Sequence, residues 1–207
     1  MNSGRLPNPW LPHPDPVGEP VPPADTAAPA RFAPVRPQAG LAAEPASDGP
    51  AFRPVPPDAP NPPWWWVGCH GGAGVSTLAA AVPGGRDAER AWPLPPPRRT
   101  SRVVLVARTN ADGLHAAQDA ARQWAAGRVP GVTVLGLVAV ADMPGRLPRP
   151  LAALLHLVGG GVPRLWVVPW IDALRLGRPL PGTMPKGLRT LEDELGLLRV
   201  ELSGGAG

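Results

Sequence analysis

The residues best suited to chemistry lie in a glycine-rich stretch, HGGAGVST, at residues 70–77. It follows the apolar run Trp64–Gly68 and precedes an alanine-rich segment. Glycines let a backbone approach a charged oxygen through dihedral angles that a side chain would forbid. A strand, a glycine turn and a helix start, in this order, are typical of phosphate-binding loops, because backbone N–H groups then point at the anion. The stretch predicts a phosphate site, and a tight structural turn is the alternative.

The candidate binding residues belong to this turn and to the start of the helix expected after it. They are Gly71, Gly72, Ala73, Gly74, Val75, Ser76 and Thr77. Ser76 could ligate Mg²⁺ through its hydroxyl, or Ser76 or Thr77 could cap the helix. The standard pattern GxxxxGK[ST] is not met, because Cys69 stands at its first glycine and Val75 at its lysine. We expect ATP or another nucleotide with Mg²⁺, held mainly by the backbone.

Polar residues outside the turn are secondary candidates. Arg108 ends an apolar run and could reach a phosphate bidentately, although a solvated arginine fits the pattern better. Asp142 follows another apolar run, as a Mg²⁺-ordering carboxylate would, although a turn residue fits better. A histidine is mostly neutral at pH 7, so His70 is interpreted as a polar loop residue. No catalytic residue is assigned, because Cys69 has no identifiable base and no Ser-His-Asp set can be assembled.

The elements that must position these residues alternate between strands and helices. Strands are expected at 64–68, 102–109, 132–140 and 164–170, helices at 76–82, 110–127, 149–158 and 185–198, and an irregular connection at 84–101. In the second helix, Leu114, Ala117, Ala121 and Trp124 form one apolar stripe. This alternation predicts an α/β fold with a doubly wound parallel sheet of about four or five strands. The glycine turn after its first strand makes the expected fold similar to that of P-loop NTPases. Ligands of such sheets bind at the carboxyl ends of the strands.

The chain of 207 residues has two parts of different composition. Nineteen of its 33 prolines lie in residues 1–63, which have few large apolar side chains, so we predict a disordered Pro-rich tail there. An α/β domain is expected over 64–200 and a flexible C-terminus over 201–207. The single cysteine excludes an internal disulfide. No apolar run is long enough for a membrane span, and no signal peptide is recognised, so we expect a cytoplasmic protein.

The turn resembles the deviant phosphate loop of the ParA/MinD ATPases, KGGxGK[ST]T. His70 falls on the signature lysine of that family, Val75 on its phosphate-loop lysine, and Ser76 on its Mg²⁺ ligand. The runs RVVLVART, VLGLVAVAD and RLWVVPW are similar to later strands of the family, so the likeness is collinear over about 64–172. Both lysines are absent, and RDAERAWPLPPPRRTS fills the place of a strand that ends in Asp. The chain also resembles small uncharacterised P-loop-like proteins of GC-rich bacteria.

The resemblance implies a degenerate P-loop protein, a non-hydrolysing or weakly nucleotide-binding scaffold or regulator. Two alternatives stay open: an unusual ATPase in which an arginine replaces the loop lysine, and a DNA-associated partition or transfer protein. The formal net charge of +4, with the excess after residue 63, leaves nucleic acid as a candidate partner. Protein partners are expected, and a homodimer is one candidate. Trp64, Trp65 and Trp66 are expected in the core, and a partner-binding patch is the alternative.

Overall fold

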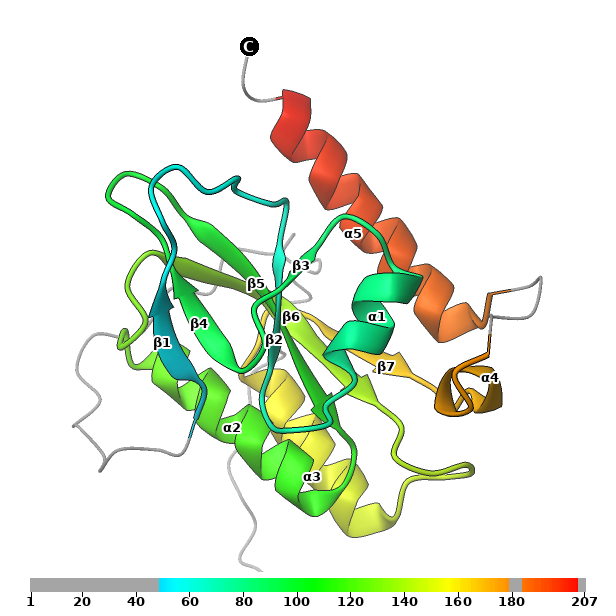
Figure 1. The fold of residues 1–207 in the computed structure, drawn as a ribbon. Coiled ribbons are helices and arrows are strands. Elements are labelled where there is room, and N and C mark those ends of the chain that lie inside the picture. Colours follow the sequence, from blue (N-terminus) through cyan, green and yellow to red (C-terminus); the bar gives the residue numbers. More distant parts are fainter. Residues whose placement is uncertain (1–48, 179–183, 205–207) are drawn as a thin grey trace, which may run out of the picture. The chain divides into compact units, whose positions relative to one another are not determined.

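The fold comes from a computed structural model, which describes residues 49–178 and 184–204 (Figure 1). These residues contain a five-stranded sheet in the order β3-β2-β5-β6-β7, with every neighbouring pair parallel. The strands are β2 (Trp65–Gly68), β3 (Arg86–Asp87), β5 (Ser101–Arg108), β6 (Val132–Val140) and β7 (Leu165–Val168). The expected α/β class and the parallel sheet of about four or five strands are confirmed.

Helices cover both faces of this sheet. They are α1 (Val75–Ala81), α2 (Ala111–Ala125), α3 (Arg149–Gly160), α4 (Asp172–Arg175) and α5 (Lys186–Gly204). Figure 1 shows α2 and α3 side by side on one face and α1 and α5 on the other, and the two main hydrophobic clusters follow the same division. Within the residues described, none of the helices combines the length and the apolar character that crossing a membrane requires.

The tryptophans at the start of β2 are core residues. Trp65 points into the cluster with α2, while Trp64 and Trp66 point into the cluster with α1 and α5. The rings of Trp64 and Trp66 meet edge to face, with centroids 5.8 Å apart. The three side chains are at most 8% exposed, so the alternative of a partner-binding patch is wrong. Alternation along a strand buries all three because both faces of the sheet are covered.

Helix α2 forms as its sequence predicts. The Asn110 side chain accepts a hydrogen bond from the Gly113 N–H at 2.8 Å and caps the first turn. All four residues of the expected apolar stripe are buried. Gly127, just after the helix, has φ +70°, a left-handed conformation that costs glycine little. Local signals therefore fix both ends of this helix.

Residues 84–101 are not the irregular connection that the sequence suggests. They contain β3 and β4 (Ala91–Leu94), and β4 pairs in parallel with β1 (Ala51–Pro54) in a second, two-stranded sheet of the described chain. Each of these strands has at most four residues, too few for a periodicity, and their pairing is distant in sequence. The buried Trp92 indole N–H donates to the Gln123 amide oxygen at 2.7 Å and fastens β4 to α2.

The terminal boundaries also differ from expectation. The predicted disordered tail, 1–63, is wrong for 51–54, which form β1, and its residues 1–48 lie outside the described residues. The predicted flexible C-terminus, 201–207, is wrong for 201–204, because α5 continues to Gly204, and 205–207 lie outside the described residues. The buried face of α5 consists of Leu188, Leu191 and Leu195.

Gly85 allows the tryptophans to pack as they do. A Cβ atom at this position would overlap the indole nitrogens of both Trp64 and Trp66. We predict that Gly85→Ala lowers the free energy of unfolding by about 1–3 kcal/mol, because overpacking must displace a large ring or the backbone. Urea denaturation followed by tryptophan fluorescence measures this. The control is Gly160→Ala in α3, where a Cβ meets nothing within 4 Å. Equal stability of the two variants would contradict the packing argument.

Candidate functional site

The topology creates a crevice between the carboxyl ends of β2 and β5. These strands are neighbours, yet the helix that follows β2 covers one face of the sheet and the helix that follows β5 covers the other. Adjacent strands whose helices diverge in this way leave an opening between the two connections, where open α/β sheets bind their ligands. The glycine turn leaves β2 at this opening, and Arg108 is the last residue of β5. The sheet therefore brings the turn and this arginine together.

The glycine turn has a backbone that depends on its glycines at two positions. Gly72 has φ +75° and Gly74 has φ +101°, and Gly74 is the N-cap of α1. No side chain of the described residues caps this helix, so the expectation that Ser76 or Thr77 caps it is wrong. Both hydroxyls are exposed instead. The turn therefore presents backbone and two exposed hydroxyls to the crevice.

All seven predicted binding residues line one open cleft of about 490 Å³. Ala73 and Val75 are nevertheless 2% and 8% exposed, and both belong to the hydrophobic cluster of α1 and α5. Val75, which stands at the lysine position of the resembling family, therefore serves packing. The sequence suggested that the backbone would have to replace the lysine, and the buried valine is consistent with that.

The cleft has an acidic side formed by the end of β3. Asp87 and Glu89 line it there together with Arg90, and Ser76 lies beside Asp87 with 3.5 Å between Oγ and Oδ2. The other Asp87 oxygen accepts from the Glu89 N–H at 2.5 Å, which fixes the carboxylate. The Glu89 side chain pairs with Arg53 at 2.7 Å, and this hydrogen bond holds the Glu89 pKa below its ordinary value. Asp87 makes no ion pair within the described residues and lies beside Ser76.

The opposite side of the cleft is basic and is joined to the end of β5. The Arg108 guanidinium donates from Nε to the Gly72 carbonyl at 3.3 Å and from Nη1 to the Ala141 carbonyl at 3.0 Å. Arg108 therefore links the glycine turn to the end of β6. It is half-buried and fixed, not the solvated arginine that the sequence favoured.

His70 also holds the turn in place, through hydrogen bonds of its imidazole ring. Its Nε2 accepts a hydrogen bond from the Arg108 backbone N–H at 3.0 Å, and its Nδ1 lies 2.8 Å from the Gly71 carbonyl. A carbonyl can only accept, so Nδ1 carries the proton and the imidazole is neutral. His70 is a structural residue of the loop, in keeping with the interpretation from sequence.

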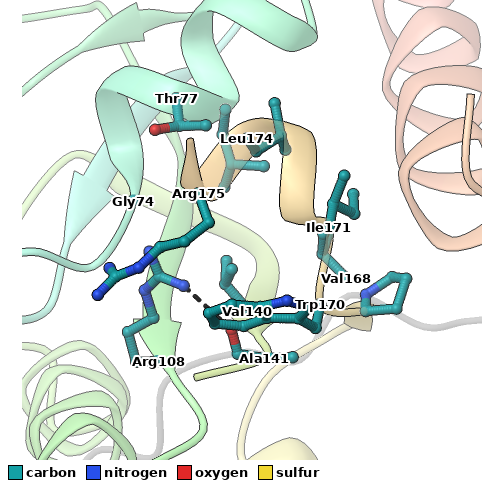
Figure 2. A pocket seen from close by; sticks show the side chains of 12 residues that line it. Gly74, Thr77, Arg108, Val140, Ala141, Val168, Trp170, Ile171, Leu174 and Arg175 are labelled. Atoms are coloured by element: carbon teal, nitrogen blue, oxygen red, sulfur yellow. Dashed lines mark hydrogen bonds between the residues drawn. The ribbon is translucent and has the colours of Figure 1, made fainter. Parts of the chain in front are cut away.

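A second cavity of about 230 Å³ adjoins the cleft (Figure 2). It shares Gly74, Thr77, Arg108 and Arg175 with the cleft, and the rest of its wall is formed by Leu78 of α1 and by apolar residues at and after the ends of β6 and β7. Figure 2 shows the Arg175 side chain, from α4, beside that of Arg108. The Arg175 guanidinium also lies 5.9 Å from the centre of the Trp170 ring, a cation–π contact. The two cavities together form one continuous depression at the carboxyl edge of the sheet.

Two of the residues just described were not expected from the sequence. Asp87 is the last residue of a strand of two residues, which leaves no periodic signal. Arg175 follows the last strand of the sheet and reaches the turn only through the tertiary fold. Asp142 is exposed and does not line either cavity, so its more favoured interpretation as a turn residue fits the structure.

Comparison with known proteins yields a family without a known activity. The family model described as "Family of unknown function (DUF6668)" matches residues 63–191, and the chain belongs to this family. The match covers the sheet and both cavities. No curated protein and no solved structure matches the chain.

Cys69, at the start of the turn, is unsuited to nucleophilic catalysis. It is 2% exposed, and burial raises its pKa from the ordinary 9.0 to about 12. At pH 8 only about one molecule in 10⁴ would carry a thiolate.

We predict that Cys69 in the folded protein resists a thiol reagent such as DTNB at pH 8 and reacts at once in urea. The unfolded thiol ionises near 9.0 and the folded one near 12, so the stability that this burial contributes is complete below pH 9 and falls as the pH rises to 12. Rapid labelling of the folded protein at pH 8 would contradict the burial.

Proposed function

We propose that this member of the DUF6668 family binds a nucleotide with Mg²⁺ at the crevice between β2 and β5, and that it acts as a non-hydrolysing scaffold or regulator. One observation carries the proposal: the glycine turn opens into a cleft with an acidic side and a basic side. A nucleotide–metal complex has the matching distribution of charge. Its phosphates suit arginine and backbone N–H groups, and its cation suits carboxylate and hydroxyl oxygens.

The oxygens present fit magnesium. Ser76 Oγ and Asp87 Oδ2 are hard ligands and lie close together. Within residues 49–178 and 184–204 no group of three or more His, Cys, Asp or Glu side chains could hold a metal by itself. Magnesium is commonly bound by one or two protein oxygens together with waters and phosphate oxygens, and does not need a complete protein cage. A bound ion would neutralise phosphate charge, and Ser76 and Asp87 would hold it.

The resemblance to the ParA/MinD loop supports nucleotide binding, and the same loop argues against rapid hydrolysis. The phosphate-loop lysine stabilises the charge that develops on the transferred phosphoryl group. Loss of one charge-assisted hydrogen bond costs about 1.5–3 kcal/mol in binding, and loss of one preorganised donor costs about 10²–10³ in rate. With Val75 in the core, a regulator whose partners or second copy respond to the bound nucleotide is the function that we favour.

We predict that the full chain binds ATP in the presence of Mg²⁺, measured by isothermal titration calorimetry, with ADP and GTP in parallel. Gly74→Asp should abolish this binding, because it adds a side chain where φ is +101° and a negative charge beside the phosphates. The matched control, Gly127→Asp, makes the same change at φ +70° where a Cβ meets nothing within 4 Å, and it should bind as the unaltered chain does. No binding at millimolar nucleotide would overturn the proposal.

An unusual ATPase is a second candidate, because Arg108 brings a fixed positive charge to the turn. Its Nη2 lies 3.7 Å from the position that a Cβ of Gly74 would occupy. On the proposal that we favour, no Mg²⁺-dependent phosphate release from ATP is expected above the buffer rate. Two results together would favour the ATPase. The unaltered chain would release phosphate from ATP, and Arg108→Ala would fold but release none.

A further inference from the structure

We propose that Arg108 and Arg175 together form a subsite for the terminal phosphates of a polyphosphate ligand and thus supply the charge that the missing lysines would carry. The inference rests on the proposed function, because it concerns the same crevice. It adds a binding residue, Arg175, and a ligand preference. The site should select ligands by their number of phosphates, and the base should matter less.

The two arginines come from distant parts of the chain and meet at one place. Arg108 ends β5, whereas Arg175 lies in α4, after β7. Both line the cleft and the adjoining cavity, as Gly74 does, and in the view of Figure 2 the two side chains overlap. The sheet aligns the carboxyl ends of its strands, so both connections end at the same edge.

Arg108 is the fixed member of the pair. Two of its five guanidinium N–H donors are used by the carbonyls of Gly72 and Ala141. Its Nη2 faces Gly74, where the absence of a side chain leaves room for an oxygen. An anion seated over the turn would therefore meet a donor that is already oriented, at a small cost in side-chain entropy.

Arg175 is the exposed member of the pair. Its guanidinium contacts the Trp170 ring, and the Trp170 indole N–H donates to Asp172 at 2.7 Å, which holds the ring in place. This contact orients Arg175 toward the cleft without neutralising it. Within the described part of the chain, neither Arg175 nor Arg108 makes an ion pair. Two guanidinium groups beside each other repel, and a shared anion converts that repulsion into attraction.

The chemistry of the pair favours phosphate over carboxylate. A terminal phosphate carries about two negative charges and three acceptor oxygens, so one group can engage both arginines. The cleft of about 490 Å³ has room for a chain of phosphates that runs from the glycine turn. AMP, whose single phosphate would sit at one end of such a chain, should gain the contact with only one of the two arginines.

The test measures binding of ATP, ADP, AMP and inorganic tripolyphosphate to the full chain and to Arg175→Gln by calorimetry. The control is Arg178→Gln, an exposed arginine three residues further on that lines neither cavity. We expect Arg175→Gln to weaken the binding of ATP and of tripolyphosphate by about 10- to 100-fold, which is the scale of one charge-assisted hydrogen bond. The affinity for AMP should stay nearly unchanged. Arg178→Gln should change none of these affinities. Because Arg175 is exposed, its variant should fold, and circular dichroism checks this.

The outcomes separate this inference from the proposed function. If ATP binds and Arg175→Gln binds it equally well, the two-arginine subsite is wrong and the nucleotide site stands. If tripolyphosphate binds in an Arg175-dependent way and ATP does not, the subsite stands and the nucleotide function is wrong. If neither ligand binds at millimolar concentration, both are overturned. An equal loss of AMP and ATP in Arg175→Gln would also contradict the subsite, because it would place Arg175 at the first phosphate.

Discussion

The parallel pairing of β2 with β5 is the constraint on which the rest of the structure depends. The pairing runs from Trp65 beside Val103 to Gly68 beside Val106. It thus brings together the carboxyl ends of two strands that are more than thirty residues apart in the sequence. Since the helices after these strands take opposite faces, the pairing opens a crevice that neither connection can close. The three tryptophans before the turn pack this arrangement, because they bury large rings on both faces of the sheet.

Two positions of the turn, at which the ParA/MinD loop that it resembles has lysines, hold the turn in place through their side chains. His70 holds two backbone groups in its neutral form, and Val75 belongs to the core. Neither contributes charge. The positive charge at the crevice comes from other elements, through Arg108, Arg175 and Arg90. The crevice therefore has cations although its glycine turn has no lysine, and the sheet determines their position.

The two charged sides of the cleft have different physical origins. The acidic side depends on β3, a strand of two residues that reaches the sheet only because β2 offers it an edge. The Arg53–Glu89 ion pair engages one of the two carboxylates of the cleft, and the other, Asp87, lies beside Ser76. The basic side depends on carbonyl acceptors that fix Arg108 and on an aromatic ring that orients Arg175. A ligand with a cation at one end and anionic oxygens along its length matches this order of charges.

The sequence by itself determined the local elements. Apolar runs predicted four of the strands, the stripe from Leu114 to Trp124 predicted α2, and the glycines located the turn, because period and turn chemistry are encoded within a few residues. Only the tertiary structure decided which residues face the cleft. Asp87 lies at the end of a strand too short to show a pattern, and Arg175 reaches the turn from after β7. Pairing between distant segments follows from packing of the whole sheet, which no local window of the sequence contains.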